Sequence, residues 1–480
     1  MLLHPKTGWY ALAGLMILFL AMQLILIQAD PSVDISTSRG PFTDEGLNTC
    51  QARNYINHGR WGVEECDNLV KSPVFNLYLA GVFKLFGTSR ITARLAILLG
   101  AIVVFMVFSK VLNKPWLSLL LLLTGGLNYF VFQFFHFSMV EILAVQFILL
   151  SIAYAYHFLH SGRRQDLILH FLFLFVTVCL KIQFLYLMVF PAGVFFQFLN
   201  HGGKGRPVKQ IGLSLLGLYI LATAVYILGW YIWVADVFDK VLFNQVTHRY
   251  SGDWSWLKAL TGNVQTFYLR PENLPLLLFF WLSLVWVMVK RKSIRPSHFL
   301  LLYLAGIWVL LEHHKLVIQW LPTRYALSLL MAMALWCSVF IYVAFKREDS
   351  LLRRWTALAA IILVGFHSFQ VGHLVLSRTY DSKKIIDQWA VNDFRGRPVA
   401  GVWATGLVWN NTAYVVPVWN DFTLMHGFME HYKPVLVVTE NGEEDSGGAF
   451  RNNGFILEEH YPVITEEHYG NYHLYFYRQP

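Results

Sequence analysis

The chain has 480 residues, of which 56% are hydrophobic and only 14% are charged, a composition that excludes an ordinary water-soluble protein. The net charge is +9, but the basic residues gather in short clusters between apolar runs, so nucleic-acid binding has no support. These numbers predict a polytopic α-helical membrane protein whose basic clusters mark its topology.

The first apolar run, residues 9–28, is long enough to span a membrane. It also has the length of a signal peptide, but no small-residue cleavage site follows it, and we therefore expect a retained span with a cytoplasmic N-terminus. Residues 29–90 then form a first external loop. Its last part, residues 73–86, is apolar but too short for a span, so we expect a helix lying in the membrane interface.

This loop contains two adjacent acidic residues, Asp44 and Glu45. Thr43 is a typical N-cap residue and Gly59 a typical residue just after a helix end, so we expect a helix with both acids in its first turn. The helix dipole favours ionised carboxylates there, which suits a general base at the membrane surface. The alternative is that the two acids only occupy the start of a helix and have no chemical role.

The remaining apolar runs predict the rest of the membrane topology. Further spans are expected at residues 91–112, 116–135, 139–159, 211–234, 274–289, 298–311, 326–345 and 355–376. Residues 167–199 are too long for one span, and we expect a short hairpin whose outer tip lies near Lys181. A second long external loop is expected at residues 235–273. About eleven spans result, and every predicted inner loop carries at least two Lys or Arg residues, as the positive-inside rule requires.

The composition changes to that of a soluble domain at about Ser377. We therefore expect a transmembrane domain at residues 1–376 and an extracytoplasmic α/β or α+β domain at residues 377–480. A helix is predicted at residues 382–392, and strands at residues 397–404, 412–419, 435–440, 455–464 and 473–478. Three tryptophans of this domain either stack on sugar rings or belong to its core: Trp403, Trp409 and Trp419.

Several polar residues are placed on the predicted outer face, and charges near membrane depth usually mark function. They are Asp44, Glu45, Glu141, Lys181, His313, His314, Lys315 and Arg324. Two acids and several cations on one face suit glycosyl transfer from a lipid phosphate, because a carboxylate can deprotonate the acceptor while cations neutralise the departing phosphate. The alternative is that each charge lies among lipid headgroups, where long basic side chains extend into water.

Other chemistries lack their motifs in this sequence. It contains no HExxH, no CxxC, no Walker loop, no GxGxxG after a strand and no GxSxG. No cofactor is therefore expected, and a divalent metal is not indicated although it stays an open alternative. Two of the four cysteines, Cys50 and Cys66, lie in the first external loop, and a disulfide between them is an open expectation if that loop is exported.

Several short motifs together resemble the GT-C glycosyltransferases of the protein O-mannosyltransferase and aminoarabinose-transferase type. The motifs are Thr43-Asp44-Glu45-Gly46, Ser72-Pro73, the run Phe83-Lys84-Leu85-Phe86-Gly87-Thr88-Ser89, and Arg94. Glu141 is similar to the second acidic position of that superfamily, and Lys181 resembles its donor-phosphate lysine, although Ile182 stands where relatives often have Gly. Arg324-Tyr325 resembles an Arg-Tyr pair at the start of a late span.

The resemblance implies transfer of one hexose or pentose, with inversion, from a polyprenyl-phosphate carrier. The acceptor would be a lipid, glycan or protein on the outer face of a bacterial inner membrane. Asp44 would be the base, with Glu45 and Glu141 holding the sugar or the acceptor. The expected substrate-binding residues are Glu141, Lys181, Arg324, His314 and Arg94.

Three other functions stay open on the sequence. A transporter or flippase of lipid-linked sugars would also need charges at membrane depth, but would show paired halves with broken helices, and no such symmetry is visible. A non-catalytic scaffold would bind a partner through its outer domain. An oligosaccharide-transferring relative would rely on a divalent metal.

Overall fold

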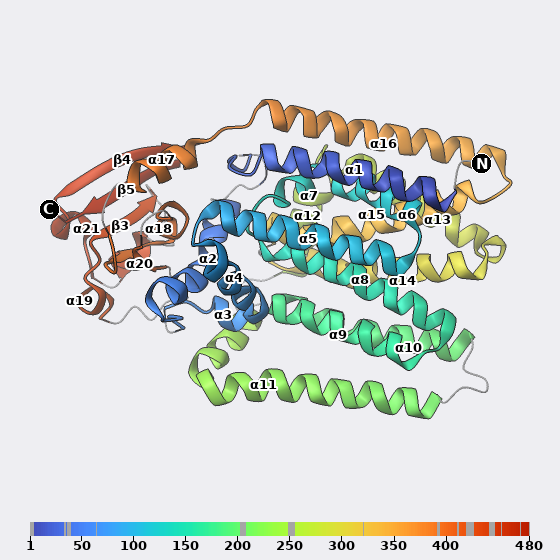
Figure 1. Cartoon of the computed structure of the whole chain (residues 1–480), viewed down its shortest axis with the longest axis horizontal. Helices are drawn as coiled ribbons and strands as arrows, with labels where there is room; N and C mark the ends of the chain where they lie inside the picture. Colours follow the sequence, from blue (N-terminus) through green and yellow to red (C-terminus); the bar gives the residue numbers. More distant parts are fainter. Residues whose placement is uncertain are drawn as a thin grey trace.

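The computed structural model describes residues 4–32, 35, 40–63, 65–201, 208–247, 255–319, 321–390, 394–409, 412–418, 427–440, 447–452, 454–470 and 472–479. Within these ranges, nine helical segments are long and apolar enough to cross a membrane. Figure 1 shows the long helices running side by side along the longest axis, with a C-terminal sheet at one end and the N-terminus at the other. The expected class, a polytopic helical membrane protein with a small C-terminal α+β region, is confirmed.

In the described part of the chain, the bundle is formed mainly by the following helices. They are α1 (Pro5–Ile25), α5 (Arg90–Leu112), α8 (Val140–Ser161), α9 (Arg164–Leu180), α10 (Phe190–His201), α11 (Val208–Thr247), α13 (Leu274–Lys290), α14 (Pro296–His313), α15 (Thr323–Phe345) and α16 (Ser350–Leu376). Helix α15 is almost entirely buried, whereas α11 lies at the edge of the bundle and exposes apolar side chains such as Leu213 and Ile220 (Figure 1). An apolar surface of this kind suits contact with lipid chains.

The predicted span at residues 116–135 differs from the observed helices. The run 116–135 is not one helix but three pieces: α6 (Pro115–Leu121), a π-helical turn (Leu122–Gly126) and α7 (Tyr129–Phe134). The break has a local cause, because the Asn128 side chain accepts hydrogen bonds from the backbone N–H groups of Phe130 and Val131, which starts a new helix.

The predicted start of the second loop, at residue 235, is wrong. Helix α11 continues to Thr247, since residues 235–247 contain no Gly or Pro to end it. Helix α12 (Trp256–Asn263) and a π-helical turn (Val264–Tyr268) occupy the end of that stretch, and residues 248–254 lie outside the described residues.

The predicted hairpin at residues 167–199 is present. Helix α9 ends at Leu180, Lys181 is its C-cap residue, and the chain returns through a 3₁₀ helix (Ile182–Val189) into α10. Lys181 therefore lies at the tip of the hairpin, as expected from the sequence. The predicted total of about eleven spans stays a prediction.

The first loop contains α2 (Gly40–His58), α3 (Asn68–Lys71) and α4 (Pro73–Phe86), and the bounds of α4 are those expected for the interfacial helix. The expected N-cap at Thr43 is wrong, because α2 starts at Gly40, which puts Asp44 and Glu45 in the second turn. Pro41 favours the earlier start, since proline is tolerated in a first helical turn, where backbone N–H groups have no partner within the helix. Gly59 follows the helix end at φ 70°, as expected.

The C-terminal sheet region (residues 381–479) has one mixed five-stranded sheet with the order β2-β1-β3-β5-β4. Its strands are β1 (Pro398–Ala400), β2 (Tyr414–Val416), β3 (Leu436–Glu440), β4 (Val463–Tyr469) and β5 (Tyr472–Arg478). Its helices are α17 (Asp381–Ala390), α18 (Val402–Leu407), α19 (Phe428–Tyr432), α20 (Gly447–Asn452) and α21 (Leu457–His460). Strands β2, β1 and β3 are parallel, and β5 pairs antiparallel with β3 and β4.

Two expectations for this region are corrected or decided by the structure. The strand expected at residues 455–464 is wrong for its middle part, which forms helix α21. Glu458 and Glu459 lie in the first turn of this helix, where the helix dipole favours carboxylates. Trp403 and Trp409 are buried, which confirms the core alternative for both, and Trp419 lies outside the described residues.

Helix α2 is docked directly on the C-terminal sheet region. Arg53 donates hydrogen bonds to the carbonyl oxygens of Thr405 (2.6 Å) and Val408 (3.0 Å). Asn54 donates to the carbonyl of Val415 (2.7 Å) and accepts from its backbone N–H (3.1 Å). These bonds satisfy buried polar groups on both sides of the contact, so α2 and the sheet region hold each other in place.

A second contact joins the start of α17 to the chain that follows α1 and to the first residue of α5. Asp30 accepts from the backbone N–H of Asp381 (2.6 Å) and from the Thr379 hydroxyl (2.9 Å). Arg90, the first residue of α5, donates to the Ser382 hydroxyl (2.6 Å). The end of the bundle that carries the sheet region, called the sheet end below, is therefore fixed at two places (Figure 1).

Gly46 allows α2 to approach α18 closely, which generates a prediction. A Cβ at this position would lie 2.4 Å from the backbone nitrogen of Gly406, closer than any real contact. We expect Gly46→Ala to destabilise the protein by about 1–3 kcal/mol through overpacking, seen as a lower thermal unfolding midpoint in detergent. Gly81→Ala in α4 is the control, because a Cβ there meets nothing within 4 Å. Equal midpoints for the two variants would contradict the close approach.

Candidate active site

Four charged side chains from four separate elements meet at the sheet end. They are Asp44 in α2, Glu141 in the first turn of α8, Lys181 at the tip of the hairpin and Arg324 in the first turn of α15. We call them the charged cluster. The sequence placed these residues on one face of the membrane, and the structure brings them together.

The charges alternate in sign along the cluster. Arg324 donates a hydrogen bond to Asp44, and its Nε lies 3.4 Å from Oε1 of Glu141. Lys181 donates to that same oxygen of Glu141. All four side chains are largely buried, so each charge depends on its neighbours for the solvation that water would otherwise supply.

One carboxylate oxygen of the cluster is left unpaired. Oε2 of Glu141 is buried and has no hydrogen-bond partner among the described residues, although Oε1 is shared by Lys181 and Arg324. A buried acceptor without a partner is costly, and it usually marks a position where a ligand or water donates a hydrogen bond. The site therefore has an acceptor available to a hydroxyl group.

Tyr325 and Gln183 contact the charged cluster, and neither was predicted from the sequence as a site residue. The ring centre of Tyr325 lies 4.8 Å from Nζ of Lys181 and 4.9 Å from Cζ of Arg324, so its face stabilises both cations. Gln183 donates a hydrogen bond to the Tyr325 hydroxyl. The sequence signal for Tyr325 was its place next to Arg324, whereas nothing local identifies Gln183.

Glu45 points away from the charged cluster into a separate, fully buried ion pair. Its two oxygens accept from Nε and Nη2 of Arg94, each at 2.7 Å, and Oε1 also accepts from the backbone N–H (2.9 Å) and hydroxyl (2.8 Å) of Ser138. The remaining Arg94 nitrogen donates to the carbonyls of Ile27 (3.0 Å) and Ala29 (2.9 Å). Burial raises the pKa of Glu45, but Arg94 and Ser138 outweigh it and hold the pKa below its ordinary value.

A third buried group lies where α14 meets α15. Glu312 accepts from Lys315 (2.7 Å), Ser328 (2.7 Å), Trp308 (2.9 Å) and Tyr186 (2.5 Å). Lys315 also donates to the carbonyl of Tyr325 (3.1 Å), so this group fixes the start of α15, where Arg324 lies. Its sequence signal was a pair of opposite charges three residues apart at membrane depth.

His314 lies beside this group rather than in the charged cluster. Its Nδ1 donates to the carbonyl of Leu311 (2.5 Å), and its ring packs on Tyr186 with centroids 4.3 Å apart. None of the contacts described for His314 reaches Asp44 or Arg324. A role in substrate binding stays a prediction for His314.

Within the described residues, no group of three or more His, Cys, Asp or Glu side chains is placed to hold a metal ion. His313, which the sequence placed next to His314, instead contacts the Tyr268 hydroxyl (2.5 Å) and the carbonyl of Val309 (2.7 Å).

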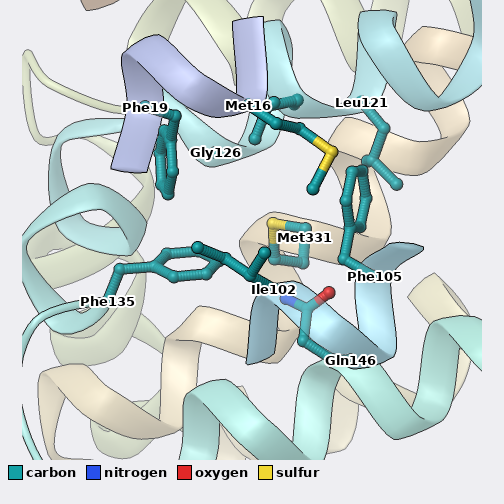
Figure 2. A pocket seen from close by; sticks show the side chains of 10 residues that line it. Met16, Phe19, Ile102, Phe105, Leu121, Gly126, Phe135, Gln146 and Met331 are labelled. Carbon is teal, nitrogen blue, oxygen red and sulfur yellow. The ribbon is translucent and has the colours of Figure 1, made fainter. Parts of the chain in front are cut away.

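A pocket inside the bundle has a different character from the charged cluster. Figure 2 shows that its lining is apolar except for the amide of Gln146, whose Oε1 is buried without a partner among the described residues. The apolar lining residues are Met16, Phe19, Ile102, Phe105, Leu121, Leu122, Gly126, Phe135 and Met331. No member of the charged cluster lines this pocket, so it lacks the groups that phosphate chemistry requires.

The arrangement of the helices and of the C-terminal sheet region is similar to that of the solved ArnT and oligosaccharyltransferase structures, which confirms the expected resemblance at the level of the fold. The crystal structure of ArnT from Cupriavidus metallidurans bound to undecaprenyl phosphate is similar over 96% of this chain and 98% of its own, with 14% identity and a TM-score of 0.61. ArnT in the apo state is similar over 97% and 98%, with 14% identity and a TM-score of 0.56.

A more distant structure shares the fold in part. The Archaeoglobus fulgidus oligosaccharyltransferase, in complex with Zn and sulfate, is similar over 88% of this chain and 67% of its own, with 12% identity and a TM-score of 0.50. No protein-family model and no curated protein sequence matches the chain.

The buried pair between Glu45 and Arg94 generates a prediction for stability and its pH dependence. Glu45→Gln keeps the shape but leaves the Arg94 charge unpaired, which should cost about 3–5 kcal/mol at neutral pH. Because the folded-state pKa of Glu45 lies below the ordinary 4.5, the pair stabilises fully above pH 4.5 and less as the pH falls toward the folded pKa. Thermal midpoints of the two proteins should therefore converge in acid.

The control for this measurement is Glu430→Gln, which changes an exposed glutamate in α19. Equal thermal midpoints for wild type and Glu45→Gln at neutral pH would show that the pair does not contribute the proposed free energy of unfolding.

Proposed function

We propose that the chain is a glycosyltransferase that moves one monosaccharide, with inversion, from a polyprenyl-phosphate carrier to an acceptor on the outer face of a bacterial inner membrane. The observation that carries this proposal is the charged cluster, in which two cations and two carboxylates converge at one end of a GT-C fold. In the proposed topology, the N-terminus is cytoplasmic, residues 1–376 form the catalytic membrane domain, and residues 377–480 form an outer domain.

Two cations supply the electrostatic part of the reaction. The bond between the anomeric carbon and the phosphate oxygen breaks, and the carrier leaves as a polyprenyl phosphate. Lys181 and Arg324 would neutralise the charge that develops on this phosphate, and their burial makes the interaction stronger than it would be in water. The ArnT structure that contains undecaprenyl phosphate supports a carrier of this class for the same fold.

Asp44 would act as the general base. It removes the proton from the acceptor hydroxyl while the acceptor oxygen forms its bond to the anomeric carbon. A carboxylate that is paired with a guanidinium is a weak base, because the pairing favours its charged form. Arg324 holds Asp44 in this paired state in the structure.

The pairing of Asp44 with Arg324 implies a fixed order of events. A donor phosphate would compete with Asp44 for Arg324. Once the phosphate is bound, Asp44 is released toward the acceptor and gains basicity. Donor binding would thus activate the base.

The remaining residues have supporting roles in the proposal. The unpaired Oε2 of Glu141 would accept a hydrogen bond from a sugar hydroxyl. Glu45 and Arg94 have their polar atoms occupied by each other and by Ser138, so we assign them a positioning role. The acceptor is a lipid, glycan or protein that reaches the sheet end from the outer face.

The role of Asp44 is tested by Asp44→Asn in proteoliposomes with a radiolabelled sugar on polyprenyl-phosphate donors. We expect transfer to fall by about 10²- to 10⁴-fold, the usual contribution of a general base. Binding of polyprenyl phosphate should be retained or become tighter, because Arg324 no longer has a competing carboxylate. Asp387→Asn, at an exposed carboxylate of α17, is the matched control.

Other outcomes of that assay would reject parts of the proposal. Equal transfer by wild type and Asp44→Asn would remove Asp44 from the base role. Absence of transfer from every donor by well-folded wild type would favour the flippase or the scaffold, which a lipid-linked sugar translocation assay then separates.

Chelation separates this proposal from the oligosaccharide-transferring alternative. Because side-chain cations would neutralise the leaving phosphate, we expect EDTA to leave the transfer rate unchanged. Loss of transfer with EDTA, and its recovery with a divalent metal, would contradict this assignment of the cations.

A further inference from the structure

We propose that Cys50 and Cys66 form a disulfide that ties the loop after α2 to the helix that carries Asp44. The inference concerns a covalent modification beyond the proposed reaction, and it rests on the outer-face placement of this loop in the proposed function. Exported compartments are oxidising, so a cysteine pair held together there is normally found as a disulfide.

The two side chains already meet in the structure, where both are present as thiols. Cys50 lies inside α2, is fully buried and donates a hydrogen bond to the carbonyl of Leu47 (3.2 Å). Cys66 is also buried, and its thiol interacts with that of Cys50. The bond would thus join two buried thiols that already interact.

The backbone around Cys66 is held against α2 by other contacts. Gln51, the neighbour of Cys50, donates to the carbonyls of Cys66 (2.6 Å) and Gly62 (3.2 Å) and accepts from the backbone N–H of Leu69 (2.5 Å). One buried amide thus fixes the chain on both sides of Cys66. These hydrogen bonds hold the backbone of Cys66 beside α2, in which Cys50 lies.

A reactive or catalytic thiol is the competing interpretation, and the surroundings oppose it. The hydrogen bond with Cys50, followed by burial, raises the pKa of Cys66 well above its ordinary value, so little thiolate is available in the folded state. Reactive cysteines are instead accessible and close to positive charge. The pair fits a structural bond that forms while the loop is still open during folding.

The oxidation balances with a protein oxidant of the thiol–disulfide exchange class. The two thiols lose two electrons and two protons as the S–S bond forms, and the oxidant's own disulfide takes them up and becomes a dithiol. No group of the proposed transfer reaction takes part.

The crosslink would brace the contact between this loop and the C-terminal sheet region. Glu65, next to Cys66, is buried and accepts hydrogen bonds from Tyr414 (2.9 Å) and Tyr432, and it pairs with Arg60 (2.9 Å). With the disulfide in place, Glu65 keeps its position against both tyrosines. The sheet region is then held at α2 by a covalently closed loop as well as by Arg53 and Asn54.

The test counts thiols in the wild-type chain, so no variant has to fold. Full-length protein is purified from membranes without reductant, denatured, alkylated with a maleimide and weighed intact. We expect two of the four cysteines, Cys179 and Cys337, to react before reduction and all four after it. Peptide mapping should recover residues 50 and 66 as one linked species. Four reactive thiols before reduction would overturn the proposal.

A second measurement separates this failure from a failure of the proposed topology. Lys84→Cys introduces an exposed thiol in α4, and a membrane-impermeant maleimide should label it in intact cells if the loop is outside. Four free thiols with labelling at residue 84 would reject the disulfide alone. Four free thiols without such labelling would reject both the disulfide and the outer-face placement.

Discussion

A fully buried ion pair between Glu45 and Arg94 holds together the end of the molecule where the candidate site lies. Burying two charges is costly, and it is tolerated only when the geometry is good and the remaining polar atoms are satisfied. Both conditions hold, because Arg94 also donates to the chain after α1 and Glu45 also accepts from Ser138. One pair therefore fixes α2 against α5 and against the approach to α8.

This constraint determines where Asp44 points. Adjacent residues of an α-helix are separated by about 100° around its axis, so Asp44 faces another direction once Glu45 is fixed. That direction is toward Arg324 in α15. Arg324 in turn contacts Glu141, and Glu141 pairs with Lys181. The close approach of Gly46 to α18 and the bonds of Arg53 add the sheet region to the same framework. Structure and proposed chemistry thus use the two neighbouring acids for different tasks.

The sequence was informative wherever the signal was local. Apolar runs predicted the membrane class, the length of residues 167–199 predicted the hairpin with Lys181 at its tip, and Gly59 predicted the end of α2. What it could not show was pairing between distant segments. Nothing near Glu45 indicates that Arg94 and Ser138 will enclose it. The early start of α2 at Gly40-Pro41 and the extension of α11 through residues that contain no Gly or Pro were also missed.

The most direct test of the account is the position of the donor phosphate. A cryo-EM structure of the full chain in a lipid nanodisc with a polyprenyl phosphate would show it. The account predicts the phosphate between Lys181 and Arg324, with the hydrogen bond from Arg324 to Asp44 broken. A phosphate bound elsewhere in the bundle, with that hydrogen bond intact, would contradict the assignment of the charged cluster as the site of transfer.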